Sequence, residues 1–118
     1  SCESCHNNPA ALGYGRGDLR YQPTPTGGRW RFTPASERVP ADGFPANAWI
    51  PFLGERHDRV STRDDVRPFS IEEQRRILRV GACLTCHGAR SNVMRDSVRD
   101  FDRLLARRSP RCVLPVWN

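Results

Sequence analysis

A five-residue pattern, Cys-x-x-Cys-His, occurs twice in this chain and constrains its fold more than any other feature. Its members are Cys2, Cys5 and His6 in residues 2–6, and Cys83, Cys86 and His87 in residues 83–87. The chain has only three histidines, and two of them occupy this position. The histidine is therefore part of the pattern, and the two copies are expected to do the same chemistry.

Cys-x-x-Cys-His is the attachment signal of c-type haem. Two thiols three residues apart on a helical turn can bond the two vinyl groups on one side of a haem. The residue that follows then presents its imidazole to the iron from the proximal face. The sequence therefore predicts two covalently attached haem c groups, with His6 and His87 as the proximal iron ligands.

The four motif cysteines are also compatible with two other kinds of site. Two Cys-x-x-Cys pairs could form a four-cysteine zinc site, but zinc ribbons separate their pairs by about 15–20 residues. Here 76 residues, 7–82, lie between the motifs. A Cys-x-x-Cys pair can also be a redox dithiol, which is expected in a βαβ setting. Neither alternative requires a histidine after the second cysteine, so haem is favoured.

On residues 2–6 and 83–87, about a tenth of the chain, the sequence resembles the small dihaem c-type cytochromes. The intervening residues 7–82 carry no family signature that we recognise. The resemblance implies covalent haem, assembly outside the cytoplasm, and electron transfer as the default role. It also implies a periplasmic or extracellular protein from which a secretion signal has been removed.

Two haems offer four axial positions, and three histidines cannot fill them all. After His6 and His87, only His57 remains for a distal position, although it could simply be solvated. Met94 is a second distal candidate because Met/His ligation is common in cytochromes c, although a methionine can equally fill a gap in a core. The fifth cysteine, Cys112, is a weaker candidate ligand, and its alternatives are a buried free thiol or an intermolecular disulfide.

The residues between the motifs predict an irregular fold. Residues 9–68 hold eight of the ten prolines and seven of the nine glycines, which interrupt every window that a helix would need. The same segment is too rich in aromatic residues for a disordered linker. We therefore expect mostly irregular coil with a few α-helices and little or no β-structure, ordered by packing on haem. A short strand is indicated only at residues 30–32.

The C-terminal third predicts helices. Ser70 and Glu73 fit a capping box, so a helix is expected from about residue 71 towards Cys83. Within it, Gly81 would let haem or another helix approach closely. Residues 92–108 predict one further helix, which carries an apolar stripe at spacings of four, three and four residues. The stripe consists of Met94, Val98, Phe101 and Leu105.

Together these segments suggest a single dihaem domain over residues 1–118. The first motif and a wrapping coil fill residues 1–68, and the helical haem-binding segment and a C-terminal tail fill residues 69–118. The apolar tail, residues 112–117, is expected to dock on its own domain or on a neighbour.

The formal charge of +6 comes from 19 arginines, with no lysine, against 13 acidic residues. A net positive charge alone is weak evidence for nucleic acid binding, and we expect no nucleic acid partner. Arginines can instead pair with haem propionates. No run of 18 apolar residues exists, so no membrane span is expected.

No Ser/His/Asp set, paired-carboxylate site or phosphate-binding loop is evident in the sequence. We therefore expect an electron carrier and not an enzyme. Its partners would be a redox protein or identical subunits of a haem-bearing assembly or filament. The alternative is a haem enzyme, similar to the dihaem peroxidases, that uses an open distal site.

Overall fold

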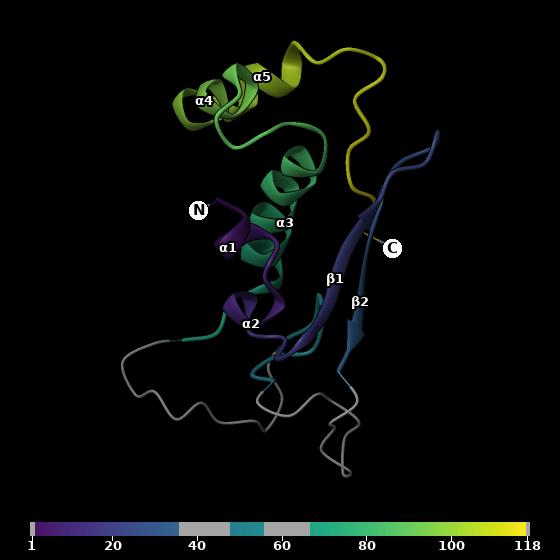
Figure 1. Cartoon of the computed structure of the whole chain (residues 1–118), viewed down its shortest axis with the longest axis vertical. Coiled ribbons are helices and arrows are strands. Elements are labelled where there is room, and N and C mark those ends of the chain that lie inside the picture. The colour runs from purple at the N-terminus through teal and green to yellow at the C-terminus, as the bar shows by residue number, and fades with distance from the viewer. Residues whose placement is uncertain (1, 36–47, 56–66, 118) are drawn as a thin grey trace.

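The computed structural model describes residues 2–35, 48–55 and 67–117. Its elements are α1 (Cys2–His6), α2 (Pro9–Leu12), β1 (Gly17–Gln22), β2 (Arg29–Pro34), α3 (Ile71–Cys86), α4 (Asn92–Arg99) and α5 (Phe101–Ala106). Helix α3 stands at the centre, with α1 beside it, the β1–β2 hairpin along it, and α4 and α5 beyond its C-terminal end (Figure 1). None of the described helices is long and apolar enough to cross a bilayer.

The prediction of mostly irregular coil with little or no β-structure is wrong. About 42% of the described structure is helical and about 15% is extended. Strands β1 and β2 pair antiparallel, from Gly17 opposite Pro34 to Gln22 opposite Arg29. The prolines and glycines of residues 17–34 lie at the outer strand ends and in the connecting turn, which leaves two five-residue runs, 18–22 and 29–33, free of both. The predicted extended segment at residues 30–32 is confirmed within β2.

Aromatic side chains of the hairpin pack on protein and form a conventional core. Its buried members are Leu12, Tyr14, Tyr21, Trp30, Ile50, Leu78 and Ala82. The rings of Tyr21 and Trp30, which are opposite each other in the register, have centroids 5.3 Å apart. The indole Nε1 of Trp30 donates to the carbonyl oxygen of Leu78 in α3 at 2.9 Å. The expectation that these aromatics are ordered by haem is therefore corrected, because the hairpin packs directly on α3.

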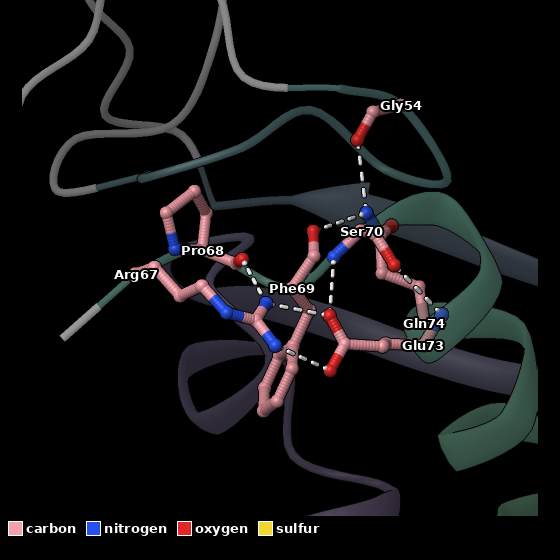
Figure 2. A network of polar contacts seen from close by, with 7 residues as sticks. All are labelled: Gly54, Arg67, Pro68, Phe69, Ser70, Glu73 and Gln74. Carbon is pink, nitrogen blue, oxygen red and sulfur yellow. Dashed lines mark hydrogen bonds and ion pairs between the residues drawn. The ribbon is translucent and has the colours of Figure 1, made fainter.

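The start of α3 is the part of the fold that the sequence predicts best. The Ser70 hydroxyl accepts from the Glu73 backbone N–H, and the Glu73 carboxylate accepts from the Ser70 N–H, so the capping box is confirmed. Arg67 holds the same carboxylate with two hydrogen bonds of 2.6 and 3.0 Å (Figure 2). These bonds lower the pKa of Glu73 to about 2, with Arg67 as the main cause.

The single helix expected over residues 92–108 is two helices. Helix α4 ends at Arg99, because Asp100 adopts an extended conformation and its side chain caps α5 by accepting from the Arg103 N–H. An Asp side chain competes well for backbone N–H groups and so favours a helix start over a helix interior. The predicted apolar stripe is also not buried as a whole: within α4, Met94 is 4% exposed, whereas Val98 is 88% exposed.

The C-terminal tail docks on its own chain. Gly28 donates to the Leu114 carbonyl at 3.0 Å and accepts from the Val116 N–H at 2.7 Å, forming a parallel bridge beside the hairpin. The Tyr21 hydroxyl donates to the Val113 carbonyl at 2.8 Å. These bonds hold the segment after Cys112 along the hairpin (Figure 1). Of the two expected outcomes, docking on its own domain or on a neighbour, the first is confirmed.

Candidate functional site

The first motif forms the short helix α1. Cys2 and Cys5 are exposed, whereas the His6 ring is half-buried against α3. The Nδ1 atom of His6 lies 2.8 Å from the backbone carbonyl oxygen of Ile77. A carbonyl oxygen can only accept, so in the neutral ring Nδ1 carries the proton and Nε2 keeps its lone pair. The contact thus orients the imidazole and leaves Nε2 able to bind a metal.

The second motif ends α3. Cys83 is half-buried, and Cys86 and the His87 side chain are exposed. Burial is the main cause that raises the pKa of the Cys83 thiol, and the nearby Cys112 adds to it. His87 is the C-terminal cap: its backbone is extended and its N–H donates to the Cys83 carbonyl at 2.8 Å. The candidate iron ligand His87 therefore lies at the junction between α3 and the turn that leads to α4.

Helix α1, which carries the first motif, packs on α3 at Gly81, two residues before the second motif begins. A β-carbon at that position would lie 2.5 Å from Asn7 Oδ1, 2.8 Å from the His6 carbonyl oxygen and 3.0 Å from Trp30 Cζ2. The prediction that Gly81 permits close approach of another helix is thus confirmed. The carbonyl that holds His6 belongs to Ile77, six residues before Cys83, which is about 9 Å along the helix axis at 1.5 Å per residue.

The distal ligand candidates have different outcomes. His57 lies outside the described residues. Met94 is buried in α4, and a core-filling methionine would be buried in the same way. Its role as a haem-iron ligand therefore stays a prediction. Cys112 is exposed, so it is not the buried free thiol that was one alternative to ligation. It lies near enough to Cys83 to influence the pKa of that thiol.

Sequence reasoning found the motif residues but missed their partners. The acceptor of the His6 hydrogen bond is a backbone carbonyl 71 residues away, for which no sequence pattern exists. Asn7, directly after the first motif, was also missed: its Oδ1 is buried without a hydrogen-bond partner where α1 meets α3. Its position immediately after His6 is the one signal that could have drawn attention to it.

No protein family, no curated protein and no solved structure matches this chain. Among the residues that the structure describes, no three His, Cys, Asp or Glu side chains converge where they could hold a metal ion. The assignment to the small dihaem c-type cytochromes is therefore wrong as a family assignment. Two five-residue motifs covering a tenth of the chain are too short to carry it. The same finding removes the four-cysteine zinc site, since all four motif cysteines are described.

Proposed function

We propose that this chain attaches haem covalently at its two Cys-x-x-Cys-His motifs and serves as an electron carrier. The observation that carries the proposal is the hydrogen bond from His6 Nδ1 to the Ile77 carbonyl. Histidines that bind metals almost always donate their other ring N–H to a carbonyl, carboxylate or water, which fixes the tautomer and makes the free nitrogen a better ligand. His6 has this arrangement in the fold of the polypeptide alone.

The donor set of each motif fits a haem. A porphyrin supplies four nitrogens to its iron, so the protein needs to provide an imidazole and two thiols for the vinyl groups. Three of the four motif thiols, those of Cys2, Cys5 and Cys86, are exposed and open to a large planar group. The fourth, Cys83, is half-buried beside Cys86, so a haem linked there would have one edge against the protein.

The mechanism assigned to the protein residues is one of binding and orientation. Bound haem supplies reversible one-electron chemistry at its iron. His6, held by Ile77, would offer Nε2 to the iron of a haem linked at the first motif, and His87, at the end of α3, would offer its imidazole to the iron of the second. Because α1 packs directly on α3, the two attachment points lie on adjoining helices, which favours electron exchange between them.

The remaining parts of the proposal follow from covalent attachment. Haem linked in this way is assembled outside the cytoplasm, so we place the protein in the periplasm or outside the cell. An exposed motif at α1 leaves a haem there accessible to a redox partner or to a second copy of the chain. No enzymatic role is proposed.

Paired serine substitutions test attachment at each motif. The Cys2→Ser/Cys5→Ser and Cys83→Ser/Cys86→Ser variants are each expected to lose one covalent haem, because serine forms no thioether. Cys112→Ser, which changes a cysteine outside both motifs, is the matched control and should keep both haems. The measurement is intact mass after denaturation, together with the haem absorbance per chain. A double variant that keeps two covalent haems would contradict the assignment.

A further inference from the structure

Arginines gather on α4, α5 and the residues next to them. The segment from residue 88 to residue 111 holds seven arginines and three aspartates, so it contributes four of the six net positive charges of the chain. All seven arginines are exposed. They are Arg90, Arg95, Arg99, Arg103, Arg107, Arg108 and Arg111. We refer to the exposed surface of this segment as the arginine face.

The charge of the arginine face is not neutralised within the described structure. Within residues 2–35, 48–55 and 67–117, none of the seven arginines takes part in an ion pair. The Asp100 carboxylate instead caps α5 by accepting from the Arg103 backbone N–H at 3.1 Å. Arg108 donates to the Leu105 carbonyl at 2.7 Å, which leaves its charge uncompensated. The face therefore presents a concentrated positive potential to an anionic partner.

The arginine face also contains an exposed large hydrophobic side chain. Val98 lies on α4 between Arg95 and Arg99 in sequence and is 88% exposed, the most exposed of the large hydrophobic residues described. Binding to the phosphates of a nucleic acid needs positive charge alone. A protein interface, in contrast, combines an apolar centre with a polar rim. The combination therefore favours an acidic protein surface over a nucleic acid.

The arginine face also lies next to the second motif. Helix α3 ends at Cys86, His87 caps it, and α4 begins at Asn92 after a short turn. In Figure 1 the two helices stand beyond that end of α3, away from the core between α3 and the hairpin. A protein bound to them would thus lie close to the second attachment point.

We propose that the arginine face is the docking surface for an acidic redox protein, with Val98 as its apolar anchor and the second motif as the point of electron exchange. The inference deepens the proposed function and rests on it for the identity of the partner as a redox protein. The surface itself depends only on the charges and exposure described above.

The test measures binding of two fluorescent acidic peptides to the native protein by anisotropy. One peptide is polyglutamate, and the other has the same number of glutamates with interspersed leucines. Four arginines of the face are replaced by glutamine in one variant: Arg95, Arg99, Arg103 and Arg107. The matched control replaces four arginines in and beside the hairpin, with the same change in net charge: Arg16, Arg20, Arg29 and Arg31.

The face variant should weaken binding of both peptides at least about tenfold, roughly 1.4 kcal/mol, whereas the hairpin variant should change it far less. The leucine-containing peptide should bind the native protein more tightly than polyglutamate, and Val98→Ser should remove that preference. Equal losses in the two arginine variants would overturn the inference, since net charge alone would then explain binding. Binding through the face to duplex DNA or to phosphatidylserine vesicles, with neither peptide bound, would also overturn it.

The haem content of the same native sample is measured separately by intact mass. Peptide binding at the face by a protein without haem would retain the docking surface and refute its redox role. A protein with two haems and no binding at the face would refute the docking surface and leave the proposed function intact.

Discussion

Replacing Gly81 by alanine is expected to lower the free energy of unfolding by about 1–2 kcal/mol, and replacing it by valine by about 3 kcal/mol. Overpacking a well-packed site costs about 1–3 kcal/mol, against which alanine recovers about 1 kcal/mol of helix propensity. The new β-carbon would lie 2.8 Å from the His6 carbonyl oxygen and 3.0 Å from Trp30 Cζ2. Backbone and a packed indole ring must therefore move, and α1 separates from α3.

The decisive readout is the state of the His6 ring. Its Nδ1–H tautomer, fixed by the Ile77 carbonyl, should be visible in the ¹⁵N shifts of the native imidazole and should be lost in Gly81→Ala. Gly88→Ala is the matched control, because a β-carbon there meets nothing within 4 Å. In urea unfolding, the free energy of unfolding of Gly88→Ala should differ from that of the native protein by no more than about 0.5 kcal/mol, as is usual for surface substitutions. Equal stability of the two alanine variants would show that α1 does not pack at Gly81.

Replacing Gln74 by leucine is expected to destabilise the fold by about 3 kcal/mol or more, since each buried polar group left unsatisfied costs about 1–3 kcal/mol. Gln74 is fully buried, and its Oε1 accepts from the Tyr14 hydroxyl at 2.8 Å. Its Nε2 donates to the carbonyls of Gly54 at 2.9 Å and Phe69 at 3.2 Å, which ties the turn at residues 51–54 to the start of α3 (Figure 2). Leucine offers neither a donor nor an acceptor to these groups.

A double-mutant cycle with Tyr14→Phe separates loss of the network from simple misfit. Tyr14 is fully buried, and burial is the main cause that raises the pKa of its phenol, so a hydroxyl that has lost the Gln74 acceptor has no water to replace it. The Tyr14→Phe/Gln74→Leu variant should therefore be less destabilised than the sum of the two single changes. Strictly additive effects in urea unfolding would argue that the hydrogen bond between Tyr14 and Gln74 contributes nothing.

Local signals in the sequence were sufficient where one short segment determines the structure. The Ser70–Glu73 capping box places the start of α3, and residues 30–32 mark part of β2. The number of prolines and glycines in residues 9–68 does not predict the hairpin, because strand pairing depends on where these residues fall and not on how many there are. The spacing of apolar residues does not predict the break at Asp100, because the break depends on a polar side chain that caps the next helix.

The candidate site was predictable only in part for a related reason. Each motif specifies its own thiols and imidazole, because those residues are neighbours in sequence. The packing of α1 on α3, the hydrogen bond to Ile77 and the burial of Asn7 Oδ1 depend on contacts across more than seventy residues. Such contacts arise from the tertiary fold, and neither motif carries a local signal for them.

Intact mass and the reduced absorption spectrum of the native protein test the central claim most directly. The account predicts a polypeptide that carries two covalent haems after denaturation and a sharp α-band on reduction. Motif cysteines that remain free thiols, in a colourless protein with the mass of the bare chain, would contradict it.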